Sequence, residues 1–242
     1  MRGIWLFAVA LLLMGSDVKA MTLTERLYEA RVGDYLVTMQ GRTYTLLLVR
    51  GRSDAEVQIE EVVVPECVKN KGSSWRTWFE RGAKNHTSWM VYSIDLSEGR
   101  VKRCYSFSRG GWVDFSSTDH FLSTLLNLNF LPIVNRKRVG PAPAFGQPDT
   151  RPEWNPQLVY QGVKVKDASF VAYEGLWPKD GTELAGRRVT IYLPARGDLY
   201  PAHFPYWIEM SPTLPDGKVR VVDSGSHLHS PQPLLHTGPH TG

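Results

Sequence analysis

The sequence contains the residue types of several catalytic sites, but not the spacings that common enzyme classes require. It has no G-x-S-x-G, H-E-x-x-H, C-x-x-C or G-x-x-x-x-G-K-[ST] motif, which mark esterases, zinc proteases, thiol oxidoreductases and P-loop nucleotidases. Ser116, Asp119 and His120 supply the residue types of a catalytic triad. Because Asp119 falls in the first turn of a predicted helix, we interpret it as a helix-capping residue. We therefore assign no catalytic residue and no cofactor.

His227 and His229 are the candidate metal ligands. On an extended chain, side chains two residues apart point to the same side, and two imidazoles placed in this way suit Zn²⁺, Cu²⁺ or Ni²⁺. The alternative is a solvated tail in which the histidines are incidental, because four of the seven histidines lie in the last sixteen residues.

Tryptophan is abundant, with eight residues in a chain of 242. Trp75 and Trp78 are three apart and therefore neighbours on one face of a short predicted helix. Large aromatic side chains form either core or the walls of a ligand cleft, and both interpretations stay open. The predicted ligand-binding residues are Trp75, Trp78, Trp89, Trp112 and Leu126.

The first twenty residues are typical of a secretory signal peptide. Arg2 is followed by an apolar run over residues 4–14, and Ala20 ends a short-side-chain cleavage site. We expect an exported protein of the periplasm or the extracellular space, with no transmembrane segment after cleavage. The alternatives are an uncleaved anchor or a cytoplasmic protein that starts at Met21.

Charge and cysteine content restrict the partners and the redox state. A net charge of +4 on 242 residues is too small to favour nucleic acid as a partner. Export leads to an oxidising compartment, so we predict a disulfide between Cys67 and Cys104, with two free thiols as the alternative. Strict alternation along residues 101–108 places Cys104 on the more polar face of a strand.

The pattern of apolar residues predicts a mainly β (α+β) protein. Short helices are predicted over residues 22–30, 73–82 and 118–127. Strands are predicted over residues 34–39, 43–50, 55–64, 87–96, 100–108, 112–116, 158–165, 168–173, 187–193, 206–210 and 218–222. The short connections favour an antiparallel sheet, with two or three of these short helices on one face.

One β-rich domain is predicted over residues 21–223. Residues 141–156 include five prolines and form either a long surface loop, which we favour, or a linker between two domains. Residues 224–242 have little apolar content, which is typical of a flexible tail.

Three segments together resemble uncharacterised exported proteins of chlamydia-like bacteria. They are residues 177–186 (WPKDGTELAG), 204–209 (FPYWIE) and 119–126 (DHFLSTLL). This resemblance implies a bacterial envelope location and no activity. The order of elements also resembles the periplasmic lipoprotein carriers, which implies a sheet curved into a half-barrel over helices, with an acyl chain on its concave face.

Together these features indicate a non-enzymatic envelope protein that binds a lipid-like ligand, such as an acyl chain, or an envelope protein. The alternative is an envelope hydrolase with unidentified catalytic residues.

Export is directly testable at the N-terminus. If residues 1–20 are a cleaved signal peptide, the protein isolated from the cell envelope should begin at Met21 by N-terminal sequencing. Recovery of soluble cytosolic protein that begins at Met1 would contradict this expectation.

Overall fold

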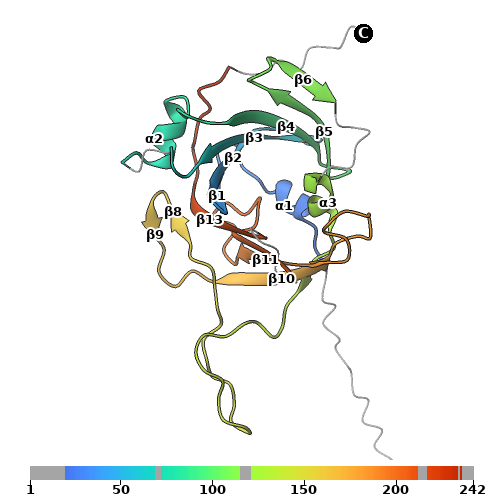
Figure 1. The fold of residues 1–242 in the computed structure, drawn as a ribbon, viewed down its shortest axis with the longest axis vertical. Helices are drawn as coiled ribbons and strands as arrows, with labels where there is room; N and C mark the ends of the chain where they lie inside the picture. The colour runs from blue at the N-terminus through green and yellow to red at the C-terminus, as the bar shows by residue number, and fades with distance from the viewer. Residues whose placement is uncertain (1–19, 69–71, 115–120, 212–216, 234, 236–242) are drawn as a thin grey trace, which may run out of the picture.

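A computed structural model describes residues 20–68, 72–114, 121–211, 217–233 and 235, so the predicted signal peptide lies almost entirely outside them. Within the described residues, eleven strands form one antiparallel sheet in the order β6-β5-β4-β3-β2-β1-β13-β12-β11-β10-β7. The sheet curls around two helices, and β6 and β7 form its edges (Figure 1). The predicted mainly β, antiparallel fold is confirmed.

The strands of this sheet are β1 (Tyr35–Gln40), β2 (Thr43–Arg52), β3 (Glu56–Pro65), β4 (Ser88–Asp95), β5 (Arg100–Ser106), β6 (Gly111–Asp114), β7 (Leu131–Pro132), β10 (Phe170–Leu176), β11 (Arg188–Pro194), β12 (Trp207–Ser211) and β13 (Lys218–Gly225). The predicted strand over residues 158–165 is instead a small separate hairpin, β8 (Val159–Tyr160) and β9 (Val163–Lys164). Its turn residues, Gln161 and Gly162, have positive φ angles, which a continuous strand does not adopt.

Two short helices, α1 (Leu23–Leu27) and α3 (Phe121–Asn127), lie on the concave side of the sheet (Figure 1). Thr22 begins α1 through a capping box with Glu25. The Thr24 hydroxyl donates to the Leu126 carbonyl at 3.0 Å and so joins the two helices. Leu125 and Leu126 are buried in the concave core.

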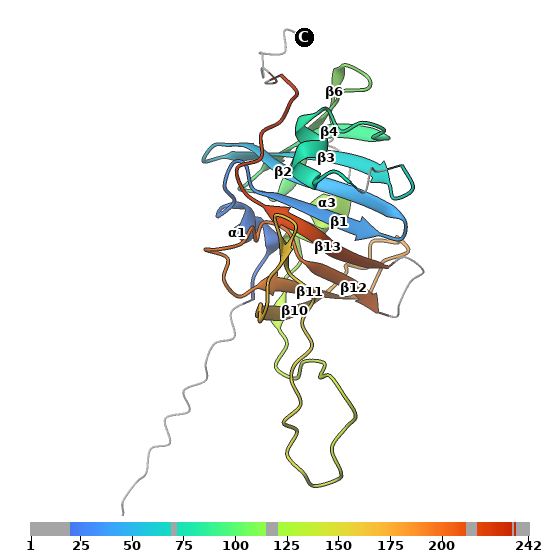
Figure 2. The same cartoon turned by 90° about the vertical axis from the view of Figure 1, so that its left-hand side faces the viewer.

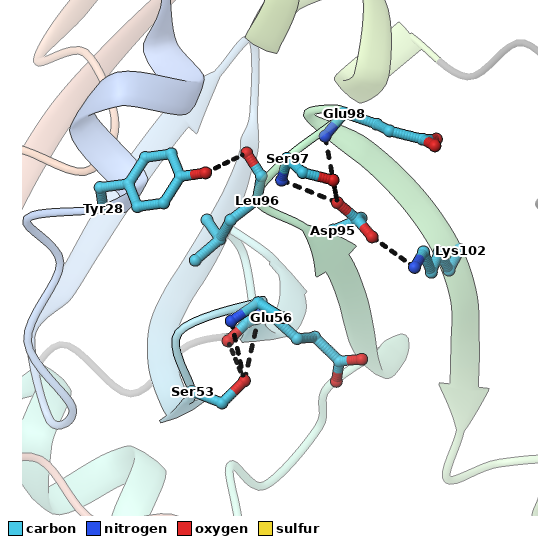
Figure 3. A network of polar contacts seen from close by, with 9 residues as sticks. Tyr28, Ser53, Glu56, Asp95, Leu96, Ser97, Glu98 and Lys102 are labelled. Atoms are coloured by element: carbon cyan, nitrogen blue, oxygen red, sulfur yellow. Dashed lines mark hydrogen bonds and ion pairs between the residues drawn. The ribbon is translucent and has the colours of Figure 1, made fainter.

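The β4–β5 turn fastens these helices to the sheet. Asp95 Oδ1 accepts hydrogen bonds from the backbone N–H groups of Ser97 and Glu98, at 2.7 and 3.0 Å, and the carboxylate pairs with Lys102 (Figure 3). These contacts hold the pKa of Asp95 well below its usual range. On the same turn, the Tyr28 hydroxyl donates to the Leu96 carbonyl at 2.9 Å (Figure 3).

The third helix, α2 (Trp75–Glu80), covers the convex face, so two of the three predicted helices, α1 and α3, share one face of the sheet (Figure 1). The reason is that β2 and β3 are apolar on both faces. Leu46 and Val62 pack outward beneath Trp78, whereas Leu47 and Ile59 pack inward. A sheet with two apolar faces must be covered on both.

Residues 226–233 form a strap across the convex face, so they are not the flexible tail that the sequence predicted (Figure 2). Leu228 is only 2 % exposed. The strap is bound by a buried ion pair between Arg50 and Glu60, with a nitrogen–oxygen distance of 3.1 Å. Ser230 Oγ donates to Glu60 at 2.8 Å, and Arg50 donates to the carbonyl of Gln232 at 3.1 Å. Two buried charges therefore find their remaining partners in the strap.

The proline-rich residues 141–156 lie in an excursion that extends far from the sheet (Figure 2). Its base is closed by backbone hydrogen bonds from Val139 to Pro152 and from Trp154 to Lys137, at 2.9 and 2.7 Å. Strands β7 and β10, on either side of this excursion, pair with each other in the main sheet.

The predicted disulfide is not formed, because Cys67 is exposed after β3 and Cys104 is 2 % exposed in the concave core. The pairing of β4 with β5 shifts its register between Ser93 and Ile94. This bulge inverts the alternation in β5, so that Val101 and Cys104 both face inward. The sequence-based alternation therefore placed Cys104 on the wrong face. Burial raises the pKa of the Cys104 thiol to about 11.

The two thiols should differ sharply in reactivity. In the native protein, 5,5′-dithiobis(2-nitrobenzoate) should label one thiol, Cys67, because Cys104 is buried and protonated. In denaturant without reductant it should label two. If no thiol is labelled in denaturant, the two cysteines form the predicted disulfide after all.

Candidate functional site

The candidate site is a cavity of about 370 Å³ on the concave side of the sheet, within the size range of small-molecule sites. Its lining side chains are mainly aliphatic and aromatic. The lining residues are Leu27, Thr38, Gln40, Thr45, Leu47, Ile59, Glu61, Tyr92, Ile94, Phe121, Leu122, Leu126, Leu184, His203, Phe204, Ile208, Met210, Gly217 and Val219.

The cavity lies between the curved sheet and two short helices, of five and seven residues, which fill only part of the hollow. Leu27 from α1 and Phe121, Leu122 and Leu126 from α3 supply one wall. Strands β1 to β4, β12 and β13 supply the other. Phe121, the first residue of α3, stacks on Trp177 with a ring-centroid distance of 5.2 Å. This contact holds the N-terminal end of α3 at the cavity wall.

A polar group lies on the strand side of the cavity. Thr38 and Thr45 are direct partners across β1 and β2, and Glu61 follows on β3, opposite Leu47. The Tyr92 hydroxyl donates to Glu61 Oε1 at 3.3 Å. Burial raises the pKa of Glu61, and only the hydrogen bond from Tyr92 opposes this shift. The same burial raises the pKa of Tyr92 above its usual range.

His203 is the most unusual residue of the site. It is 3 % exposed, and among the described residues neither of its ring nitrogens has a hydrogen-bond partner. Desolvation lowers its pKa to about 4, so the ring is neutral near pH 7 and presents one donor and one acceptor. Buried polar atoms are nearly always paired, so two unpaired nitrogens at a cavity wall indicate a place for a ligand or for water.

Of the predicted ligand-binding residues, only Leu126 lines the cavity. The structure instead places the other four predicted residues on the convex face: Trp75, Trp78, Trp89 and Trp112. The first three pack around α2, and Trp112 lies against Tyr105 and beneath the Arg103 guanidinium. The tryptophans therefore mark the covered convex face and not the cavity.

The structure gives no metal centre at the predicted ligands. His227 and His229 are exposed on either side of the buried Leu228, and His227 has a φ of 61°, so the strap is not regularly extended there. Across the described ranges, no group of three or more His, Cys, Asp and Glu residues is placed to hold a metal ion. Ser116, Asp119 and His120 lie outside the described residues.

Sequence reasoning missed Glu61 and His203 for different reasons. Glu60 and Glu61 are adjacent in an apolar strand, and the structure buries Glu60 completely on the convex side. An acid on each face of an apolar strand was the available signal for Glu61. His203 lies in a proline-rich connection without periodicity, and no sequence signal marks it.

Acid should reveal the buried neutral histidine. As the pH falls below 6.5, the unfolded chain protonates this histidine, whereas the folded chain, with a pKa of about 4, does not. The free energy of unfolding therefore falls, by about 2 kcal/mol between pH 7.5 and pH 5 from this group alone. In urea titrations, His203→Phe should lose less stability than the wild type over this interval. Equal losses would show that His203 is not buried as a neutral ring.

No helix among the described residues is both long and apolar enough to cross a membrane. No curated protein matches the chain. The solved structure of the hypothetical protein CT021 from Chlamydia trachomatis is similar in fold, with a TM-score of 0.64 and 20 % identity over 90 % of this chain and 99 % of that chain. A model of the CT021 protein family matches residues 45–166. These residues are half of the sequence and include nine of the residues that line the cavity. The chain belongs to the CT021 protein family.

Proposed function

We propose that this protein is an exported, non-enzymatic binding protein of the bacterial envelope that holds a lipid-like ligand in the concave cavity. The observation that carries the proposal is the cavity itself: about 370 Å³ of space, bounded mostly by apolar side chains, on the concave side of the sheet. Apolar cavities with a few polar groups are the usual form of small-ligand sites.

The size of the cavity suits an aliphatic chain of moderate length. Its volume of about 370 Å³ corresponds to roughly a dozen groups the size of water or of a methylene. The apolar wall from Leu47 through Ile59 to Ile94 offers such a chain dispersion contacts and no charged partner.

The arrangement supports binding better than hydrolysis. Glu61 is the single carboxylate among the described lining residues, whereas sugar hydrolysis uses a pair. His203 makes no hydrogen bond to a serine within the described part of the chain, so a nucleophile activated by this histidine is not supported. A concave cavity of this volume also favours a small ligand over a protein partner.

A substitution that fills the cavity distinguishes a ligand site from an ordinary packing defect. Leu126 lines the cavity, whereas the adjacent Leu125 is fully buried in the core and does not line it. Leu126→Trp should place its ring in the empty space, reduce binding of the neutral probe N-phenyl-1-naphthylamine by about tenfold or more, and leave stability nearly unchanged. Fluorescence titration and thermal unfolding report the two effects.

Leu125→Trp is the matched control. It should cost about 1–3 kcal/mol by overpacking and leave probe binding to the folded fraction intact. Equal destabilisation by the two substitutions, with no binding of the probe to the wild type, would contradict the proposal.

A further inference from the structure

We propose that the ligand carries an uncharged hydrogen-bonding group, a hydroxyl above all, and that His203 and Glu61 bind this group while the aliphatic part fills the cavity. This inference rests on the proposed function and adds the chemical class of the ligand. Two features support it: the polar atoms of His203 and Glu61 in the cavity wall, and the absence of a cation among the described lining residues.

The cavity presents no cation. No Lys or Arg side chain is among its described lining residues. A carboxylate or phosphate head group would leave water without a counter-ion, which is strongly unfavourable in an apolar site. Free fatty acids and phospholipid head groups are therefore poor occupants of the interior, although their chains alone would fit.

His203 presents one donor and one acceptor. Both ring nitrogens lack partners in the described structure, and the ring belongs to the cavity wall. A hydroxyl is matched to such a ring because it donates to the bare nitrogen or accepts from the N–H of the other. Binding would then remove part of the cost of burying an unpaired polar ring.

Glu61 adds a second anchoring point. Tyr92 is the described residue that hydrogen bonds to its carboxyl, through Oε1. Burial without a neighbouring cation raises its pKa. In either protonation state this carboxyl accepts a hydrogen bond, so a hydroxyl of the ligand can donate to it without adding a charge to the cavity. An alkylammonium would itself lose hydration on entering the apolar site, and it is the competing ligand that the experiment must exclude.

Four ligands with the same chain length test the inference: 1-dodecanol, dodecanoate, dodecylammonium and dodecane. Each is titrated near neutral pH, below its aggregation limit, against the full mature chain loaded with N-phenyl-1-naphthylamine. We expect 1-dodecanol to displace the probe about tenfold more tightly than dodecanoate or dodecylammonium. Equal or tighter displacement by either ion overturns the inference.

Variants identify the polar partners. His203→Phe should lower the affinity for 1-dodecanol to about that for dodecane, a loss of about tenfold, while probe binding persists. The matched control, His229→Phe, changes an exposed histidine on the strap and should leave all four affinities unchanged. Retention of the alcohol preference in His203→Phe overturns the role of the ring.

Glu61 is tested by a conservative and a disruptive change. Glu61→Gln keeps a neutral donor and acceptor and should preserve 1-dodecanol affinity within about threefold, whereas Glu61→Leu should weaken it by about tenfold. Loss of affinity in both variants, or in neither, overturns the role of Glu61. Probe binding without any preference among the four ligands overturns this inference alone, whereas absence of probe binding to the wild type contradicts the proposed function itself.

Discussion

The structure depends on one geometric constraint: a curved sheet encloses more space than its helices fill. The sheet bends around α1 and α3, which together contain twelve helical residues in the described part of the chain. Their leucines bury one wall of the hollow, and the hydrogen bond from Thr24 to Leu126 holds them side by side. The cavity is the part of the hollow that these two helices do not reach. Its position follows from the length of the helices, and its polarity follows from the inward residues of β1 to β4.

The two faces of the sheet have different roles. The convex face is covered by α2 and the strap, and it contains the tightest polar contacts, centred on Arg50 and Glu60. Trp89 Nε1 donates to Glu60 at 2.6 Å there, next to the ring of Phe79. Removal of one member of such a buried pair typically costs about 3–5 kcal/mol, so this face stabilises the sheet. The concave face contains the cavity in which we propose that the ligand binds.

The sequence predicted the strands well because most of them alternate on at least one face and end at turn residues. Strands β1 to β4 were expected within a few residues of their bounds, and so were the first residues of α1 and α2. The failures arise from tertiary contacts. A bulge in the β4–β5 pair reverses the face of Cys104, and the buried charges of Arg50 and Glu60 order a polar strap that resembles a tail in sequence.

The candidate site was less predictable than the fold, because its polar residues come from segments without a shared pattern. Leu126 was found by helical periodicity, but Glu61 is assigned to the cavity only by the curvature of the sheet, and His203 only by the path of the connection before β12. Tryptophan, the strongest compositional signal, marked the convex core instead.

The central claim is that the cavity is occupied in the native envelope. Native mass spectrometry of the full mature protein, purified gently from its own source, tests it most directly. The account predicts a second population that is heavier by the mass of a neutral, hydroxyl-bearing lipid and that returns to the mass of the polypeptide after extraction with organic solvent. A single population at the mass of the polypeptide, before and after extraction, would contradict it.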